Sequence, residues 1–350
     1  MTQPSAVSEQ HPKASPVLAF FMRGWWRFVL VVRRGGAWGC CALGLLAGCS
    51  AAPTVPVGSP YPPTSAFAAH ALPGEGDAIV QTLQRAERVA PLRYRVIVLP
   101  GSGCAGMGAF ADRYFAGLLH AQVLVLHKPG VGSGDHTAPG DCPRDFVQRD
   151  RLSAWLAHAR AALRADALQR QGQPPVPQLL VGISEGAELL PALAPEVPHL
   201  AGLVLLSSSG LDPQEAGALQ ADRLGVLMDW QAVGAEVVGR RPDTAVVQGR
   251  SLGYWRDLWQ WPLAGPLLQG PWPVLQVWGS ADALVPAAAY ERFAQRGAMR
   301  QPPLCVHRLE GADHGLQGAA VHGGDGVQRA WALTEQWARN PQAGLCTALP

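Results

Sequence analysis

Short runs of apolar residues alternate with helical patterns from Tyr94 to the end of the chain. Six such runs predict strands: Arg95–Leu99, Gln122–Leu126, Gln178–Ile183, Gly202–Leu206, Pro273–Trp278 and Leu304–Leu309. Helical patterns cover residues 143–171, 185–193 and 327–338. Because the strand runs are almost continuously apolar, we expect an α/β fold with a mostly parallel sheet and helices on both faces. The pattern of Ile79–Val89 fits a strand or a helix.

The alternation stops between Gly210 and Gly270. Residues 211–270 have a helical pattern and lie between two predicted strands of the sheet, so we expect a helical cap inserted over the sheet edge. The insertion carries four tryptophans: Trp230, Trp255, Trp259 and Trp261. These tryptophans either line a pocket for an acyl or aromatic group or pack the cap onto the sheet.

The first fifty residues have the pattern of a targeting segment. Basic residues end at Arg33 and Arg34, and an apolar region of about twelve residues follows, which suits a signal-peptide core better than a membrane span. It ends in Leu46–Cys49 (LAGC), which resembles the bacterial lipoprotein box. We therefore expect residues 1–48 to be removed, with translation starting at Met1 or Met22, and Cys49 to carry the lipid. An uncleaved anchor and an ordinary cleaved signal are the alternatives.

Residues 49–76 are rich in Pro, Ala and Ser, and we expect them to form an extended tether that holds the body away from a membrane. The predicted location is therefore the periplasmic face or the surface of a bacterial cell, with the lipid on Cys49 as the contact with the membrane.

Charge is concentrated in the leader. The 350 residues carry a formal net charge of +2, whereas residues 1–48 alone hold five basic side chains and one acid, a net of +4. The remaining body therefore carries 2 − 4 = −2, and it has no basic stripe, which argues against a nucleic-acid partner. No apolar run reaches the ~20 residues of a membrane-spanning helix, which argues against an integral membrane protein.

Seven cysteines fit an exported protein. Cys40 and Cys41 leave with the signal peptide and Cys49 takes the lipid, so four remain: Cys104, Cys142, Cys305 and Cys346. Four cysteines in an oxidising compartment allow three pairings into two disulfides. We favour Cys104–Cys142 and Cys305–Cys346, because each would tie a loop to its neighbour, with four free thiols as the alternative. No close pair of Cys or His residues suggests a metal site.

The segment Gly182–Gly186 (GISEG) is the most specific chemical motif. It follows a predicted strand directly and precedes a predicted helix, which is the context of a nucleophile elbow. Ser184 at the tip of such a turn adopts a strained backbone, and glycine on both sides avoids steric collision. The motif predicts Ser184 as a nucleophile, with a Gly-rich turn of no chemical role as the alternative.

A serine nucleophile needs a base and an acid that orients the base. His314 follows the last predicted strand and can act as general base and then general acid. Asp282 follows the preceding strand, so the chain order is Ser184, Asp282, His314, as expected for this arrangement. Asp212, after another strand, and Asp313, beside the histidine, are competing candidates for the acid.

The same chemistry needs donors for a developing oxyanion. The backbone amide of Glu185, directly after the nucleophile, is one candidate. The Gly-rich loop Pro100–Gly103 follows a predicted strand, and Ser102 within it is the other. This loop lacks the spacing of a phosphate-binding loop, so a nucleotide site is a weak alternative.

These motifs together resemble the α/β-hydrolase superfamily. The likeness covers residues 95–338, interrupted by the insertion, and rests on Pro100–Gly103, Pro129–Gly134, Gly182–Gly186, Gly279–Asp282 and His314. The resemblance implies a hydrolase core over 77–210 and 271–346, a cap over 211–270, the Ser184–Asp282–His314 triad and an oxyanion hole from the amides of Ser102 and Glu185. It implies no cofactor.

Two departures from the family pattern bear on the substrate. Pro100 stands where many members have histidine, and Glu185 replaces a commoner small or amide-bearing residue. The Glu185 carboxylate could repel anions, attract a substrate amine, or point away and pair with an arginine. We expect a serine hydrolase that cleaves a carboxylic ester. The alternatives are a serine peptidase that acts on small peptides, a non-catalytic binding lipoprotein, and an acyltransferase.

Overall fold

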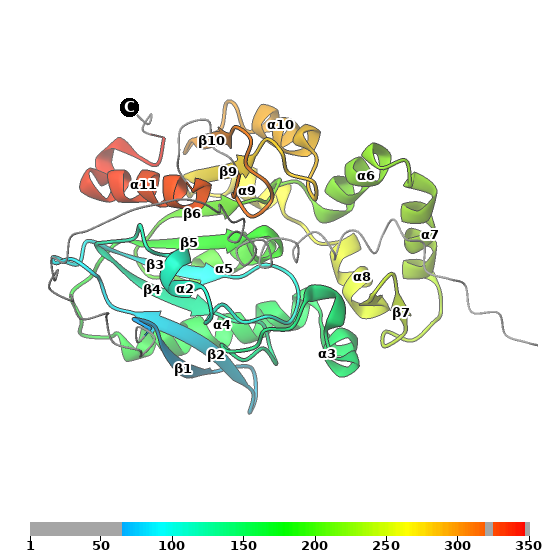
Figure 1. Ribbon diagram of the computed structural model, residues 1–350, viewed down its shortest axis with the longest axis horizontal. Coiled ribbons are helices and arrows are strands. Elements are labelled where there is room, and N and C mark those ends of the chain that lie inside the picture. Colours follow the sequence, from blue (N-terminus) through cyan, green and yellow to red (C-terminus); the bar gives the residue numbers. More distant parts are fainter. Residues whose placement is uncertain (1–64, 319–324, 347–350) are drawn as a thin grey trace, which may run out of the picture.

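The computed structural model describes residues 65–318 and 325–346. The predicted signal peptide, Cys49 and most of the predicted tether lie outside these residues. An eight-stranded sheet forms the centre of the molecule, in the order β1–β2–β4–β3–β5–β6–β9–β10 (Figure 1). The strands are β1 (Ala68–Pro73), β2 (Ile79–Arg85), β3 (Tyr94–Leu99), β4 (Ala121–Leu126), β5 (Gln178–Ile183), β6 (Leu200–Leu206), β9 (Val274–Gly279) and β10 (Leu304–Leu309).

All six strands predicted from the apolar runs are present, as β3, β4, β5, β6, β9 and β10, and they run parallel to one another. The ambiguous segment is strand β2, which pairs antiparallel with β1 and β4. The tether prediction is wrong for residues 68–73, because they form β1. Leu72 is the single buried residue of β1 and lies opposite Val80 of β2, so the strand carries little apolar signal of its own.

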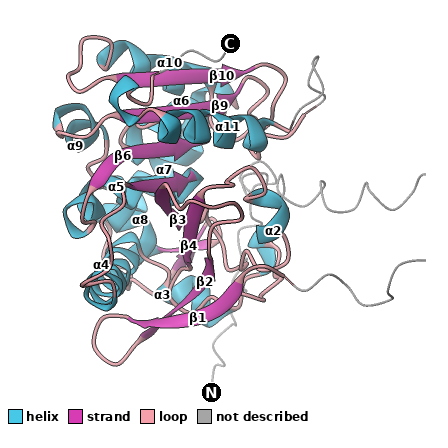
Figure 2. Ribbon diagram, turned by 90° about the vertical axis from the view of Figure 1, so that its left-hand side faces the viewer, coloured by secondary structure: helices cyan, strands magenta, loops and turns pink. Residues whose placement is uncertain are grey.

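Helices cover both faces of the sheet (Figure 2). The side chains of β3 alternate between the two faces: Val96 and Val98 pack with Trp331 of α11 (Gly326–Arg339), and Ile97 and Leu99 pack with α4 (Leu152–Gln169). Both sides of the strand are therefore buried, which is why residues 96–99 are apolar, while the buried Arg95 is paired with Asp166. Helix α2 (Ala111–Tyr114) lies on the α11 side and was not predicted, and neither was α10 (Ala287–Arg296).

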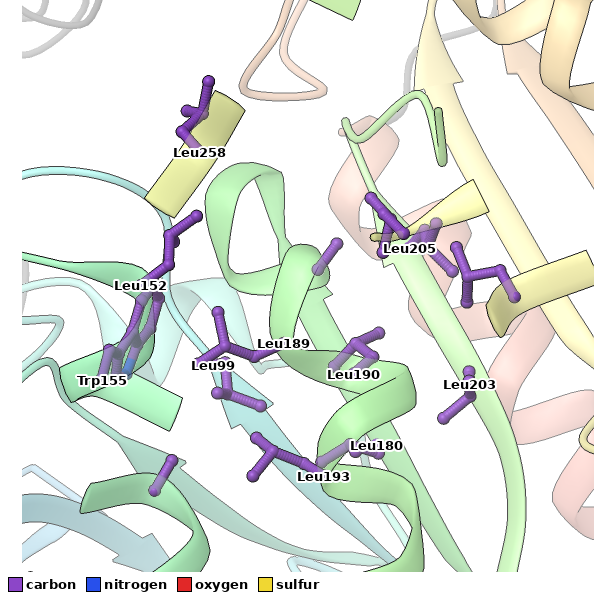
Figure 3. Packing of buried hydrophobic residues seen from close by; sticks show 14 of the residues in the cluster. Leu99, Leu152, Trp155, Leu180, Leu189, Leu190, Leu193, Leu203, Leu205 and Leu258 are labelled. Carbon is purple, nitrogen blue, oxygen red and sulfur yellow. The ribbon is translucent and has the colours of Figure 1, made fainter. Parts of the chain in front are cut away.

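Two predicted helices differ in detail. Residues 143–171 form α3 (Arg144–Arg149) and α4, separated by extended backbone at Asp150 and Arg151. The segment after Ser184 starts as a 3₁₀ helix, η3 (Ser184–Leu189), and continues as α5 (Leu190–Leu193) and η4 (Ala194–Glu196). Figure 3 shows leucines of η3 and α5 beside Leu99 and Leu180 of the sheet, so the segment that follows the serine is anchored in the core.

Residues 211–270 are mainly helical, as predicted. They form α6 (Pro213–Arg223), α7 (Leu227–Val238), α8 (Leu252–Trp259) and α9 (Ala264–Gln269), with a short hairpin of β7 (Val246–Val247) and β8 (Arg250–Ser251). Helices α6, α7 and α8 lie together to one side of the sheet (Figure 1). Helix α8 also packs on α3 and α4, which joins the insertion to the core.

Two disulfides link loops to their neighbours, in the pairing favoured from the sequence. Cys104 pairs with Cys142 and Cys305 with Cys346, with Cα–Cα distances of 5.7 and 5.1 Å. Disulfides persist in oxidising compartments, so they indicate a periplasmic or extracellular location. None of the helices within residues 65–318 and 325–346 has the length and apolar character needed to cross a membrane.

Candidate active site

The serine turn at the end of β5 is strained. Ser184 has a φ of +50°, in the left-handed region that side chains other than glycine rarely adopt. A Cβ at Gly182 would lie 2.2 Å from the Ala187 Cα, and one at Gly186 would lie 2.3 Å from the Leu99 carbonyl oxygen. Both glycines are therefore required by the close approach of backbone, as the sequence motif predicted.

Three of the predicted site residues form a hydrogen-bonded chain. The Nε2 of His314 lies 3.0 Å from the Ser184 Oγ, and its Nδ1 lies 2.8 Å from the Asp282 Oδ2. Ser184 follows β5, Asp282 follows β9 and His314 follows β10, so three parallel strands deliver the three side chains to one edge of the sheet. Such a chain lets the imidazole take a proton from the serine hydroxyl.

The Asp282 carboxylate is buried and has a full set of donors. Its Oδ1 accepts the backbone N–H groups of Leu284 and Val285 at 2.8 and 2.9 Å, and its Oδ2 accepts the Tyr290 hydroxyl at 2.8 Å. Burial by itself would raise the pKa of Asp282. The hydrogen bond and charge of His314, together with the other donors, outweigh burial and lower the pKa. Asp282 therefore stays ionised in a position from which it can orient the imidazole of His314.

The two competing acids have other contacts. The Oδ1 of Asp212 accepts the backbone N–H groups of Leu263 and Ala264 at 2.7 and 2.8 Å, at the start of α9. The Oδ1 of Asp313 accepts the N–H of Gln317 at 2.9 Å, and burial raises the pKa of Asp313. Of the three acids proposed from the sequence, Asp282 is the one whose carboxylate lies on the histidine Nδ1.

The loop after β3 lies against the serine turn. The Cβ-equivalent position of Gly186 is only 2.4 Å from the carbonyl oxygen of Pro100, so the two segments are in backbone contact. Ser102 is half-buried in this loop. The Cys104–Cys142 disulfide ties the loop to the segment before α3. The assignment of the Ser102 and Glu185 amides as a pair of oxyanion donors remains a prediction.

The loops after β3 and β4 interlock. The N–H of Gly106 donates to the Asp135 carbonyl at 2.9 Å, and the N–H of Gly108 donates to the Ser133 carbonyl at 2.8 Å. A Cβ at Gly106 would lie 2.2 Å from the carbonyl oxygen of Gly132. The Gly-rich segment after β4 thus supports the β3 loop through backbone contacts.

Glu185, directly after Ser184, is buried and paired. Its Oε2 forms an ion pair with the Lys128 Nζ, and its Oε1 accepts the Tyr254 hydroxyl at 2.5 Å and lies 3.6 Å from Arg250 Nη2. Its carboxylate is therefore paired with an arginine, which is one of the interpretations that the sequence allowed. It is also paired with Lys128, which the sequence did not suggest. Burial alone would raise the pKa of Glu185, but the two cations and the hydrogen bonds lower it. A carboxylate held in this way is not free to bind a substrate amine.

The tryptophans of the insertion mostly pack together. Trp230 lies 4.7 Å from Trp259 and 5.9 Å from Trp255 between ring centroids. The indole N–H of Trp255 donates to the Val247 carbonyl at 2.8 Å, within the insertion. Packing, rather than a pocket, accounts for these three residues. The indole of Trp261 donates to the carbonyl of Glu188 at 2.9 Å and so contacts η3, the 3₁₀ helix that begins at Ser184.

A hollow of about 630 Å³ lies at the opposite edge of the sheet, lined by the end of α4, the segment before β5 and the segment before β6. It does not include Ser184, Asp282 or His314. No group of three or more His, Cys, Asp or Glu side chains that could hold a metal ion occurs among the described residues.

Sequence comparison with models of protein families and with curated proteins found no match. Solved structures are similar. Est1E from Butyrivibrio proteoclasticus with ferulic acid bound has a TM-score of 0.53 and 13% identity, over 78% of this chain and 99% of that one. A puromycin-hydrolyzing peptidase from Mycobacterium tuberculosis has a TM-score of 0.53 and 16% identity, over 80% of this chain and 41% of that one. DcsB in complex with a substrate analogue has a TM-score of 0.52 and 15% identity, over 79% of this chain and 100% of that one.

At these identities the likeness concerns the fold, because one fold supports many activities. This chain spans less than half the length of the peptidase. Similarity over nearly four-fifths of the chain, together with the mostly parallel eight-stranded sheet, gives this chain the α/β-hydrolase fold.

Proposed function

We propose that this protein is a serine hydrolase that cleaves a carboxylic ester through an acyl-enzyme. The observation that carries the proposal is the hydrogen-bonded chain from the strained Ser184 through His314 to the buried Asp282. In the proposed reaction the Ser184 Oγ attacks the acyl carbon and His314 takes its proton. His314 then protonates the leaving alcohol, and water activated by the same imidazole releases the acid.

The backbone supplies the proposed electrostatic stabilisation. Negative charge on the carbonyl oxygen in the tetrahedral intermediate is met by the N–H groups of Glu185 and Ser102. Asp282 holds His314 in the tautomer with the proton on Nδ1, so that Nε2 faces the hydroxyl of Ser184 as an acceptor. The proposed steps call for no metal ion or organic cofactor.

An ester is favoured over a peptide by the state of Glu185. A carboxylate beside the nucleophile would favour a substrate with a free amine only if it were unpaired and exposed. Here its negative charge is balanced by Lys128 and Arg250, and its side chain is only 6% exposed. The amine-binding role that would support an aminopeptidase therefore has no available carboxylate at this position.

The test uses the purified full-length protein, the Ser184→Ala variant and, as a matched control serine, Ser153→Ala. A fluorophosphonate probe is applied, and turnover is screened with p-nitrophenyl esters of different acyl length and with aminoacyl nitroanilides. We expect labelling of the wild type and of Ser153→Ala but not of Ser184→Ala, with turnover of esters. Turnover of nitroanilides alone would replace the esterase by a peptidase.

The remaining alternatives give different results in the same assay. A folded wild-type protein that neither labels nor turns over any substrate would contradict the proposal and favour a binding lipoprotein. Labelling with acyl transfer to an added alcohol in preference to water would identify an acyltransferase.

We also propose that residues 1–48 are a signal peptide and that Cys49 carries the lipid. The two disulfides support export of the protein. Cells that express the wild type or Cys49→Ser can be fed a radiolabelled fatty acid and extracted by detergent phase partition. We expect label and detergent-phase partition only for the wild type, and label in Cys49→Ser would contradict the assignment of the lipid.

A further inference from the structure

A buried cluster of ionisable side chains adjoins the serine turn through Glu185. Its members are Lys128, Asp150, Glu185, Arg250 and Tyr254. The Lys128 Nζ contacts both carboxylates, as an ion pair with Glu185 and at 3.0 Å from the Asp150 Oδ1. Arg250 forms an ion pair with Asp150 and lies 3.6 Å from Glu185, while the Tyr254 hydroxyl donates to Glu185 at 2.5 Å. Two cations and two carboxylates thus neutralise one another.

The members of this cluster come from four separate parts of the chain. Lys128 follows β4, Asp150 separates α3 from α4, and Glu185 is the second residue of η3. Arg250 and Tyr254 belong to the insertion, in β8 and α8. The insertion therefore reaches the residue next to the nucleophile through two side chains, and Lys128 joins the same carboxylate from the loop after β4.

One aromatic ring lies against each of the two cations. The Lys128 Nζ lies 4.7 Å from the ring centre of Trp155, and the Arg250 guanidinium lies 4.4 Å from that of Tyr254. The side chains of Lys128, Asp150 and Glu185 are each no more than 6% exposed, and that of Arg250 is 11% exposed. Little water reaches the cluster, so each charge depends on its partners within the protein.

Such a cluster is a poor way to gain stability. Burying ions costs free energy, and the attraction between them at best offsets this cost. Apolar residues of the same volume often give the folded protein equal stability. The loss of one partner, by contrast, leaves an uncompensated charge in the interior. What the cluster does provide is a fixed position for each member, because every charge is held from several directions. The member with the greatest chemical consequence is Glu185, since its backbone amide adjoins Ser184.

We propose that Arg250 and Tyr254 of the insertion, together with Lys128, are positioning residues that hold the Glu185 side chain and thereby aim the Glu185 backbone N–H at the oxyanion. This inference rests on the proposed hydrolase function and adds to it a role for the insertion. In this role the insertion contributes to the rate by stabilising the transition state. None of the three side chains touches the reacting atoms.

The mildest test is Tyr254→Phe, which removes one hydroxyl and leaves all four charges in place. Ester hydrolysis is measured with kcat expressed per active site titrated by the fluorophosphonate probe. Complete removal of one oxyanion donor costs about 10²–10³-fold in kcat, so a displaced donor is expected to cost about tenfold. KM is expected to stay within twofold, because the interaction is made in the transition state.

A trifluoromethyl ketone inhibitor provides a readout that a purely structural role would not move. It forms a tetrahedral adduct with an oxyanion, so its inhibition constant should rise in proportion to the fall in kcat/KM. Arg250→Lys keeps the charge and is expected to retain more activity than Arg250→Met. If Arg250→Met fails to fold, the Tyr254→Phe result still decides the inference.

Ser153→Ala is the matched control for an altered contact between the insertion and the core. The Ser153 hydroxyl and N–H donate to Asp257 of α8 at 2.6 and 2.8 Å, without touching Glu185. We expect this variant to keep the wild-type kcat per titrated site and the wild-type inhibition constant. Equal losses in Ser153→Ala and Tyr254→Phe would show a general loosening of the insertion and overturn the inference.

Failure of the inference is distinguishable from failure of the proposed function. A wild type that does not label or turn over any ester removes the hydrolase proposal and the inference with it. An active wild type whose Tyr254→Phe and Arg250→Met variants keep kcat within twofold leaves the hydrolase intact and overturns only the positioning role.

Discussion

The exchange Asp282→Asn tests the proposed orienting role of this carboxylate with the smallest change of shape. The two oxygens of Asp282 have different partners in the structure. Oδ1 accepts two backbone N–H groups, from Leu284 and Val285, whereas Oδ2 faces His314 Nδ1 and the Tyr290 hydroxyl. An asparagine keeps its oxygen on the two backbone donors, because the reverse orientation would place its NH₂ group against them.

This orientation forces the wrong tautomer on the histidine. The NH₂ group of the introduced asparagine donates toward Nδ1 of His314, so Nδ1 becomes the acceptor and the ring proton moves to Nε2. Nε2 then presents a hydrogen to the Ser184 Oγ, which lies 3.0 Å away, and can no longer accept the serine proton. The substitution thus removes the base while leaving the positions of the heavy atoms nearly unchanged.

The expected loss is about 10³–10⁴-fold in kcat, since the corresponding exchange in a Ser–His–Asp protease triad costs about 10⁴. At 1.36 kcal/mol per tenfold, this corresponds to about 4–5.5 kcal/mol of barrier height. The fold should lose no more than about 1–3 kcal/mol, because the two backbone donors keep their acceptor.

The assay is hydrolysis of a p-nitrophenyl ester, with labelling by the fluorophosphonate probe followed in time and the thermal midpoint measured in parallel. Asp313→Asn is the control, because Asp313 adjoins His314 in sequence while its carboxylate accepts the N–H of Gln317. We expect Asp313→Asn to keep activity within about threefold of the wild type.

The reasoning would be refuted if folded Asp282→Asn retained more than a tenth of the wild-type kcat. A large loss in Asp313→Asn with a small one in Asp282→Asn would transfer the orienting role to the neighbouring acid.

Three further predictions concern the supports of the site. Gly186→Ala places a Cβ 2.3 Å from the Leu99 carbonyl oxygen, so the turn must shift, and probe labelling should slow by about 100-fold in folded protein. Removal of the Cys104–Cys142 disulfide, which closes a loop with a sequence separation of 38, should lower the free energy of unfolding by about 4 kcal/mol in denaturant titration. Burial and the charge of Glu185 raise the pKa of Glu188 well above its ordinary value. The folded state therefore loses stability as the pH rises above the ordinary pKa of a glutamate, because the unfolded chain gives up this proton more readily. Glu188→Gln has no proton to lose at this position, so it should raise the thermal midpoint by an amount that grows from pH 5 to pH 8.

Each of these has its control. Gly265→Ala has no atom within 4 Å of the added Cβ and should label normally. The disulfide prediction fails if reduction of the wild type leaves its unfolding midpoint unchanged. A shift of the Glu188→Gln midpoint that is the same at every pH would show that the buried carboxyl does not hold its proton.

The strands were predictable because their signal is local. In β3 and β5 every residue is buried, and apart from Arg95 and Gln178 near their starts the strands consist of residues without a charged or amide side chain. β1 escaped prediction because it has one buried residue, Leu72, and owes its existence to pairing with β2. The break between α3 and α4 was not predicted for a related reason. At Asp150 the backbone is extended, and the carboxylate of this residue forms ion pairs with Lys128 and Arg250, which lie far away in the sequence.

The candidate site was predictable in part. The serine turn is a motif of five consecutive residues with a steric reason for each glycine, so Ser184 could be named without a structure. The choice among Asp212, Asp282 and Asp313 could not be settled in this way, because all three stand near strand ends or near the histidine. It depends on which carboxylate reaches the Nδ1 of His314, and that is a property of the assembled sheet.

By itself, then, the sequence determined the α/β architecture, the serine turn, the order of the three site residues and a set of cysteines suited to export. Each of these depends on neighbouring residues or on the order of strands. Only the tertiary structure decided that Glu185 is buried against Lys128 and Tyr254 rather than exposed to substrate. The physical reason is that a buried charge must be neutralised by whichever partners the fold brings to it, and here those partners lie more than fifty residues away on either side.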